Sequence, residues 1–349
     1  MDKHILEAFI AEEKIDQIKP IGSGHINDTY TVTTKDASKP LYILQRINHS
    51  IFPNIEKLSE NIYRATNHLE LNGKGQYQVM RIINTTDGKL WHKSNDGNYW
   101  RLFTHIPDSH SFDLAPNNNF AAEAGKAYGW FVRTLSTLNE PALFEVIPGF
   151  HNLGLRITQL KSAANENCVD RAKICKLELD FYLSLCDEMI EFDDLIGTPD
   201  IPLRVTHNDT KINNVLFNSN GKAISVIDLD TVMPGVVHYD FGDAIRTIAA
   251  NAIEDETQLN LVGINTELYK AFAAGFLDEI GSLLTPKELI YLPKAPRIMA
   301  YIMGIRFLAD YLRGDTYYKV KHSDHNIQRS RNQMALIIDM ENKSKAMSL

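Results

Sequence analysis

The amino-acid sequence predicts an α+β protein with two lobes, a small antiparallel β lobe with one inserted helix and a larger, mainly helical lobe. Short strand-like segments separated by turn residues fill the first part of the chain. Segments with apolar residues at helical spacing fill most of the remainder. The length of 349 residues suits two domains, which we expect at residues 1–105 and 106–349.

In the first lobe, clusters of Gly, Asp, Asn and Pro mark the turns between strands. After a short helix expected at 3–13, strands are predicted at 15–21, 27–33, 41–47, 77–84, 89–93 and 98–104. One helix interrupts them at 54–71, where Ile55, Leu58, Ile62, Ala65 and Leu69 recur at helical spacing. A helix inserted after the third strand is similar to the small lobe of a kinase.

The second lobe is predicted to be helical apart from one central hairpin. We expect helices at 119–138, 151–163, 170–192, 240–253, 265–281, 285–292 and 296–313, and a last one at 326–347. The segment 285–288, Thr-Pro-Lys-Glu, forms a capping box with Pro at the first helical position, which is a specific signal for a helix start.

The central hairpin is predicted from two strand-like runs, at 215–217 and 224–227, joined by the turn residues 218–221. A hairpin returns the chain on itself, so it would bring Asp209 and Asn214 close to Asp228. Three oxygen-bearing side chains at one end of a hairpin suit magnesium.

The residues before this hairpin have the spacing of a kinase catalytic loop. His207-x-Asp209 is followed after four residues by Asn214, with the Asp positioned to accept a hydroxyl proton and the Asn to hold a metal. Lys211 is placed to follow charge on a transferred phosphoryl group. The alternative interpretation is an inert, solvated hairpin with an Asx-rich turn.

A glycine-containing turn lies between the first two predicted strands. Gly22, Ser23 and Gly24 allow backbone N–H groups to approach a phosphate, and Asn27 and Thr29 follow on the second strand. His25, in the same turn, is placed to reach either the nucleotide or the acceptor. An ordinary hairpin turn gives the same pattern.

The third strand departs from the kinase pattern, which places a cation there for the nucleotide phosphates. The simplest register puts Gln45 at that position, and strand alternation directs Arg46 to the opposite face. Either Arg46 acts through a shifted register or the phosphates find another partner. The inserted helix offers Glu56 and Glu60 as carboxylate partners, and the sequence does not choose between them.

The last strand leads into a segment that we interpret as the hinge between the lobes. Its backbone would hydrogen-bond the adenine edge, and Phe103 or Ile106 would line an apolar slot. His105 is a further candidate for nucleotide binding. A plain strand end has the same sequence signature.

Composition excludes several function classes. The net charge of −8 argues against a nucleic-acid surface, and no apolar run is long enough to span a membrane. The N-terminal residues do not resemble a secretory signal. Cys168, Cys175 and Cys186 are odd in number and lack CxxC spacing, so we expect reduced structural thiols in a cytoplasmic protein. We further expect a monomer or weak homodimer.

Taken together, these stretches resemble the aminoglycoside phosphotransferase and choline kinase-like family, which has a protein-kinase-like fold. The resemblance is carried by residues 24–30, 44–48, 207–214, 227–235, 240–246 and 306–312. The Leu-Gln-Arg-Ile-Asn and His-Asn-Asp-Thr-Lys runs are similar to those of its sugar 1-kinase-like members.

The resemblance implies a catalytic base, Asp209, and magnesium held by Asn214 and Asp228. It implies ATP as phosphoryl donor, the anomeric hydroxyl of an N-acetylhexosamine as acceptor, and a structural role for Asp240. The expected acceptor-binding residues are His25, Asp209, Asp230, Arg246, Arg306 and Tyr317. Arg246 either contacts substrate or braces Asp243, and Arg306 either pairs with Asp310 or points into the pocket.

Two rival functions remain on sequence grounds. A kinase of the same fold acting on an amino alcohol, choline or an aminoglycoside usually adds acidic or aromatic residues around its cationic substrate. Asp230, Asp243 and Asp315 are able to supply the negative charge. A nucleotide-binding pseudokinase scaffold would explain Gln45 as a lesion, although Asp209, Asn214 and Asp228 are intact.

Overall fold

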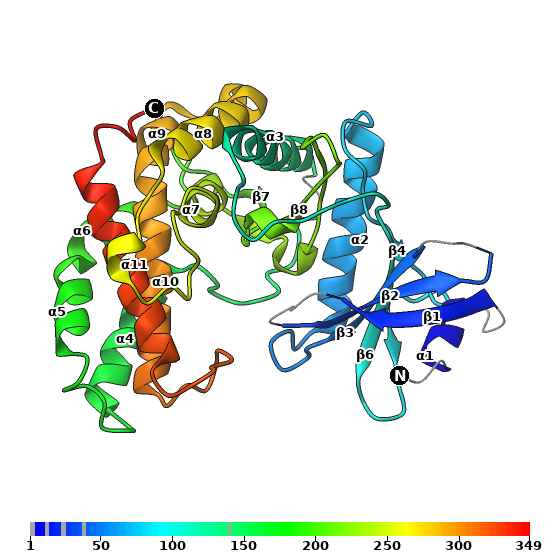
Figure 1. The fold of residues 1–349 in the computed structure, drawn as a ribbon, viewed down its shortest axis with the longest axis horizontal. Helices are drawn as coiled ribbons and strands as arrows, with labels where there is room; N and C mark the ends of the chain where they lie inside the picture. The colour runs from blue at the N-terminus through cyan, green and yellow to red at the C-terminus, as the bar shows by residue number, and fades with distance from the viewer. Residues whose placement is uncertain (1–3, 11–13, 22–25, 37–39, 139–140) are drawn as a thin grey trace. The chain divides into compact units, whose positions relative to one another are not determined.

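The computed structural model describes residues 4–10, 14–21, 26–36, 40–138 and 141–349. The chain divides into two compact units, which are treated separately below (Figure 1). The first comprises Met1–His110, Thr134–Pro148 and Val215–Pro234, and the second comprises Ser111–Arg133, Gly149–Asn214 and Gly235–Leu349. The domain boundary at residue 105 stays a prediction.

The first unit contains a six-stranded antiparallel sheet in the order β1-β2-β3-β6-β4, with β5 also paired to β6. The strands are β1 Ile15–Pro20, β2 Asp28–Thr34, β3 Tyr42–Ile47, β4 Ile82–Ile83, β5 His92–Lys93 and β6 Tyr99–Thr104. The predicted strand at 77–84 is reduced to two residues. Its earlier backbone N–H groups bond elsewhere, that of Gln78 to Ile224 O and that of Arg81 to Thr104 Oγ1.

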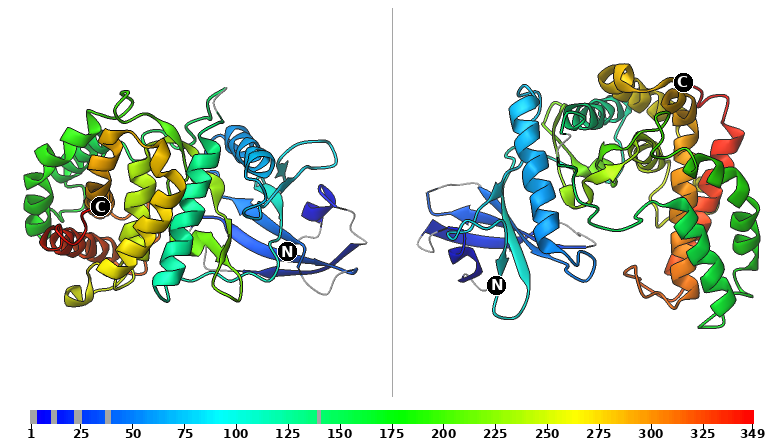
Figure 2. Two further views of the ribbon diagram at one scale, coloured as in Figure 1. Left: turned by 90° about the horizontal axis from the view of Figure 1, so that it is seen from above. Right: turned by 180° about the vertical axis from the view of Figure 1, so that it is seen from behind.

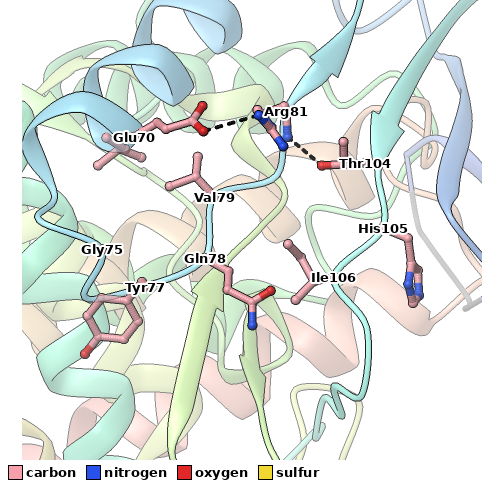
Figure 3. A pocket seen from close by; sticks show the side chains of 10 residues that line it. Glu70, Gly75, Tyr77, Gln78, Val79, Arg81, Thr104, His105 and Ile106 are labelled. Carbon is pink, nitrogen blue, oxygen red and sulfur yellow. Dashed lines mark hydrogen bonds and ion pairs between the residues drawn. The ribbon is translucent and has the colours of Figure 1, made fainter.

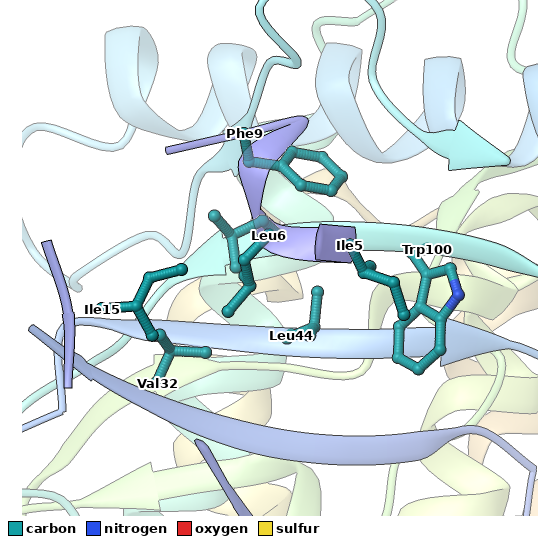
Figure 4. Packing of buried hydrophobic residues seen from close by; sticks show 8 residues of the cluster. Ile5, Leu6, Phe9, Ile15, Val32, Leu44 and Trp100 are labelled. Carbon is teal, nitrogen blue, oxygen red and sulfur yellow. The ribbon is translucent and has the colours of Figure 1, made fainter. Parts of the chain in front are cut away.

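A hydrophobic cluster covers one face of this sheet (Figure 4). Ile5, Leu6 and Phe9 pack onto strand residues that include Val32 and Leu44. Helix α1, His4–Glu7, is shorter than the predicted 3–13, and residues 11–13 lie outside the described range. Burial of apolar area therefore holds this N-terminal segment against the sheet, although its helix is only one turn long.

Helix α2, Ile55–Asn72, confirms the inserted helix. The Asn54 side chain caps its first turn by accepting a bond from the Lys57 N–H. The apolar positions predicted from the spacing are all buried, so the helix turns the expected face inward. Asn61 on the same face donates to Phe144 O (2.7 Å) and Val232 O (3.0 Å).

The predicted hairpin is also confirmed. Strand β8, Val215–Phe217, pairs with β9, Ala223–Val226, and Val215 lies opposite Val226. Gly221 in the turn has φ +74°, a left-handed conformation that costs glycine little. A 3₁₀ turn, η3 (Leu229–Thr231), and strand β10, Met233–Gly235, follow the hairpin.

The second unit is mainly helical (Figure 2). Its helices are α3 Asn118–Leu135, α4 Leu153–Glu166, α5 Lys176–Ser184, α6 Cys186–Asp193, α7 Val237–Ile248, α8 Thr266–Ile280, α9 Pro286–Tyr291, α10 Ala295–Leu312 and α11 His325–Asn342. The single helix predicted at 170–192 was wrong. The chain tightens at Leu185, whose N–H bonds to Tyr182 O three residues back, and α5 and α6 form instead.

Helix α10 lies at the centre of this unit, beside α11, α7 and α4. Glycine permits the close approach of α7, because a Cβ at Gly242 would lie 2.4 Å from Ala295 O. The capping box at Thr285 is present as predicted. No helix within the described ranges combines the length and apolar character that crossing a bilayer requires.

Candidate active site

The predicted catalytic loop, residues 207–214, follows strand β7, Arg204–Thr206, and Asp240 on α7 holds its backbone. The Asp240 carboxylate accepts the backbone N–H groups of His207 (2.8 Å) and Asn208 (2.7 Å). Burial raises the pKa of Asp240 to about 7 despite these two donors. This buried carboxylate therefore fixes the backbone just before Asp209.

Three residues predicted from the motif meet within this loop. Lys211 Nζ lies 2.8 Å from Asp209 Oδ1, and Asn214 Nδ2 donates to Asp209 O at 2.8 Å. Burial acts to raise the pKa of Asp209, but the Lys211 ammonium outweighs it, so the net shift is downward and the carboxylate is ionised. The Asp209 side chain remains 26% exposed, which leaves it accessible to a reacting hydroxyl.

Other residues of the second unit support the loop. His151 Nε2 donates to Asn208 O (3.0 Å), and Tyr128 Oη donates to Lys211 O (2.6 Å). The ring of Tyr128 also packs edge-on against His207. Asn208 itself has φ +63°, a conformation for which Asn is better suited than most residues.

The predicted metal ligands have suitable donor chemistry. Asn214 uses its amide nitrogen toward Asp209, which directs its oxygen to the other side. Asp228 follows β9 by two residues in a left-handed conformation (φ 60°, ψ 60°). Throughout the described ranges, no group of three or more His, Cys, Asp and Glu side chains suits a metal. A carboxylate and an amide oxygen completed by phosphate oxygens are, however, what magnesium takes in kinases.

Only some of the residues predicted to bind nucleotide lie within the described ranges. Gly22, Ser23, Gly24 and His25 lie outside the described residues. Asn27 and Thr29 are both engaged by polar partners: Asn27 Nδ2 donates to Asp230 Oδ2 (2.6 Å), and Thr29 Oγ1 accepts from Gln45 Nε2 (3.1 Å).

Gln45 and Arg46 lie on opposite faces of β3, in a register with no shift against β2 or β6. Arg46 pairs with Asp28 and bonds Asn98 on the exposed face. Gln45 instead accepts two bonds from Arg101, which lies directly opposite it on β6. Sequence reasoning missed Arg101, for which the available signal was an arginine inside an otherwise apolar and aromatic strand.

Two of the predicted hinge residues, His105 and Ile106, line a cavity of about 360 Å³ in the first unit, and Phe103 is not part of its lining. Figure 3 shows Ile106 directed toward Gln78 and the His105 ring on the other side of the chain. Burial lowers the pKa of His105, and Phe103 is almost completely buried. Glu70 and Arg81 form an ion pair at one end of the cavity.

Arg306 of α10 lies among aromatic rings in the second unit. Its guanidinium carbon is 4.9 Å from the Phe150 ring centre and 5.8 Å from that of Tyr317. It does not pair with Asp310, whose carboxylate accepts the N–H groups of residues 316–318 and so shapes the turn that bears Tyr317.

Of the two alternatives for Arg246, the structure has the one in which it braces Asp243. It is buried and paired with Asp243 and with Glu254. Asp230 is also buried, and Tyr317 is 49% exposed.

Three further residues near Arg306 were not singled out in the sequence. Phe150 and His151 pack together with ring centres 4.3 Å apart, and Tyr318 lies 5.7 Å from the Arg306 guanidinium. His151 Nδ1 and Tyr318 Oη are buried and have no hydrogen-bond partner among the described residues. No local pattern marks these residues, because only the fold brings 150–151 next to 306 and 317–318.

Comparison with known proteins identifies the family. The model of a family described as "Phosphotransferase enzyme family" matches residues 17–278. The chain belongs to this family. It is therefore a small-molecule phosphotransferase, and its kinase-like fold of an antiparallel sheet lobe and a larger helical lobe agrees with the sequence prediction.

Solved structures of this fold cover almost the whole chain. A microcompartment-associated aminopropanol kinase is 14% identical, with TM-score 0.65, over 99% of this chain and 98% of that one. An amicoumacin kinase in complex with AMP-PNP and Ca²⁺ is 14% identical, with TM-score 0.59, over 96% and 90%. A choline kinase from Cryptosporidium parvum is 14% identical, with TM-score 0.57, over 98% and 94%.

Proposed function

We propose that this protein is an ATP-dependent kinase that phosphorylates the anomeric hydroxyl of an N-acetylhexosamine, giving the sugar 1-phosphate. Its sequence motifs resemble those of N-acetylhexosamine 1-kinase, and family membership supports the phosphotransferase chemistry. The amicoumacin kinase of the same fold was solved with an ATP analogue, which supports ATP as the donor.

In this proposal Asp209 orients and deprotonates the acceptor hydroxyl for in-line attack on the γ-phosphorus. Its ionised state and its exposure both suit a base. Lys211, beside it, balances charge on the transferred group. Asn214 and Asp228 would hold magnesium, which would neutralise charge on the phosphates of the nucleotide. Positioning and electrostatics supply most of the rate enhancement in such reactions.

The charges of the candidate acceptor residues favour a neutral sugar over an amine. A cationic acceptor needs carboxylates that are not already neutralised. Each of the three aspartates considered for that role is paired with an arginine, as Arg101–Asp230, Arg246–Asp243 and Arg171–Asp315.

The main support for a sugar acceptor comes from the side chains around Arg306. Arg306 is 9% exposed and its recorded hydrogen bond among the described residues is a weak one to Met303 Sδ. Phe150 and Tyr317 offer ring faces, on which sugars stack, and His151 Nδ1 and Tyr318 Oη lack partners. His151 joins this group to the catalytic loop through Asn208. These side chains offer hydrogen bonds to the hydroxyl and amide groups of a sugar, and the positive charge of Arg306 repels an ammonium group.

The test is an ADP-release assay with GlcNAc, GalNAc, choline, an amino alcohol and an aminoglycoside, followed by NMR identification of the phosphorylated carbon. We expect turnover with the free N-acetylhexosamines and phosphate on C1. The methyl glycoside of GlcNAc is the matched control, because its anomeric oxygen is blocked and it should not react. Turnover restricted to amines would overturn the sugar assignment, and magnesium-dependent ATP binding with no turnover would favour a pseudokinase.

A further inference from the structure

The first unit contains a buried polar network centred on Arg101. The Arg101 side chain is 1% exposed, and its Nε and Nη2 atoms donate to Gln45 Oε1 at 3.0 and 2.8 Å. Nη2 also lies 2.5 Å from Asp230 Oδ1. A guanidinium excluded from water at this depth interacts strongly with its carboxylate partner.

The same carboxylate reaches the strand that follows the glycine-containing turn. Asp230 Oδ2 accepts from Asn27 Nδ2 at 2.6 Å, and Asn27 Oδ1 accepts the backbone N–H of Asn48 at 3.0 Å. Four residues expected at nucleotide or substrate (Asn27, Thr29, Gln45 and Asp230) thus belong to one network.

This network bears directly on the loop that carries Asp228. Asp228 has a left-handed backbone (φ 60°, ψ 60°), a conformation that is costly for a residue with a side chain unless the surroundings support it. Asp230, two residues on, is held by Arg101 and Asn27, and Val232 O is held by Asn61 of α2. The loop is therefore fastened to both the sheet and the helix.

The usual kinase arrangement is missing from the corresponding elements. Protein kinases pair a lysine of the third strand with a glutamate of the inserted helix. Here the third strand offers Gln45 and Arg46, and Arg46 is taken by Asp28 on the exposed face. Within the described ranges, Glu56 and Glu60 of α2 form no ion pair.

We propose that Arg101 and Asp230 replace that lysine–glutamate pair and act as positioning residues for the metal ligand Asp228. Gln45, at the place of the lysine, orients the Arg101 guanidinium. The ion pair fixes the loop that carries Asp228, so that the Asp228 carboxylate would be preorganised to hold magnesium. This inference rests on the proposed function only in taking Asp228 as a metal ligand, and it does not depend on the acceptor.

The test measures how strongly nucleotide binding depends on the Mg²⁺ concentration, and it does not require turnover. ADP binding is followed by calorimetry as Mg²⁺ is varied, in the wild type and in Arg101→Met, Arg101→Lys and the double variant Arg101→Met/Asp230→Asn. Loss of a residue that orients a metal ligand typically weakens metal affinity roughly 10–100-fold. We expect Arg101→Met to raise the Mg²⁺ requirement by at least tenfold while metal-free ADP binding changes less than about twofold. Arg101→Lys should recover part of the loss, because it keeps the charge but not the fork.

The double variant and a remote control separate positioning from stability. Arg101→Met leaves a buried carboxylate unpaired and should lower the melting temperature, whereas the double variant removes that charge and recovers stability. We expect its Mg²⁺ requirement to stay raised. Arg331→Met is the matched control, since it removes the partner of buried Glu178 on other helices and should cost stability without changing the Mg²⁺ requirement.

The inference is overturned if Arg101→Met shifts the Mg²⁺ requirement no more than Arg331→Met, or if the double variant restores it together with stability. An ADP affinity of the wild type that does not change with Mg²⁺ concentration would also overturn the inference. Failure of the wild type to phosphorylate N-acetylhexosamines, with the Arg101→Met shift intact, would reject the acceptor assignment alone.

Discussion

His151 donates a hydrogen bond from Nε2 to the backbone oxygen of Asn208 over 3.0 Å, directly before Asp209. Burial, together with the positive charge of Arg306, lowers the pKa of His151 to about 3 from an ordinary value of 6.5. The native state therefore holds this histidine neutral. Stability from the neutral form is complete above pH 6.5 and is lost as pH falls from 6.5 toward 3, because the unfolded chain then binds the extra proton.

We predict that His151→Gln reduces this acid sensitivity. The glutamine amide retains a donor for Asn208 O but cannot titrate, so the melting temperature should fall less steeply between about pH 6.5 and 4.5. One such proton corresponds to about 1.4 kcal/mol per pH unit at the steepest point. His322→Gln, at an exposed position, should leave the slope unchanged. Equal slopes in all three proteins would show that His151 titrates normally.

Asp209→Asn should abolish catalysis while preserving nucleotide binding. The amide keeps the shape and the neighbours of the carboxylate but cannot accept the acceptor proton. Loss of a general base usually costs about 10²–10⁴-fold in rate, and we expect at least that loss in kcat. Calorimetric binding of ADP with Mg²⁺ serves as the control for folding. Retained turnover would remove Asp209 from the mechanism.

Arg306→Met should impair acceptor binding specifically. Methionine fills the aromatic surroundings but donates no hydrogen bond, and bonds to a charged group contribute about 1.5–3 kcal/mol. We predict a rise in the KM for the sugar of roughly tenfold to a hundredfold, with the KM for ATP unchanged. Arg313→Met, immediately after the same helix, removes a contact to Gln159 O and should alter neither constant. A change in the KM for ATP alone would place Arg306 elsewhere in the reaction.

Gly242→Ala should destabilise the second unit. The added Cβ would lie 2.4 Å from Ala295 O and 2.7 Å from Met299 Cγ, which forces α7 away from α10. Overpacking of this kind costs about 1–3 kcal/mol, measurable as a lower melting temperature. Gly281→Ala is the contrasting variant. Its nearest neighbour would be 3.9 Å away and its backbone is already helical, so we expect a gain of about 0.4–1 kcal/mol.

The sequence predicted what depends on neighbours along the chain. The β8–β9 hairpin follows from the turn residues between two strand-like runs, and the inserted helix follows from its apolar period. The catalytic role of residues 207–214, inferred from their spacing, stays a prediction. Side-chain contacts between neighbouring strands were harder to predict from the sequence. Gln45 was recognised as an anomaly, but its partner Arg101 lies 56 residues away and becomes its neighbour only through the pairing of β3 with β6.

The same limit applies to the helical unit. Apolar spacing at 170–192 predicts one helix, since nothing local reveals the tight turn at Leu185. The residues around Arg306 come from two other segments, 150–151 and 317–318, so their meeting depends on packing rather than on any motif.

Asn61 connects α2 to the segment at Phe144 and, at Val232, to the loop that follows Asp228, through hydrogen bonds of its neutral side-chain amide. Many signalling kinases keep the equivalent helix loose and bring it inward only after a phosphate is added. A helix fastened by its own side chain needs no such trigger. We therefore expect an enzyme that is active without prior phosphorylation, with a rate set by the concentrations of nucleotide and acceptor.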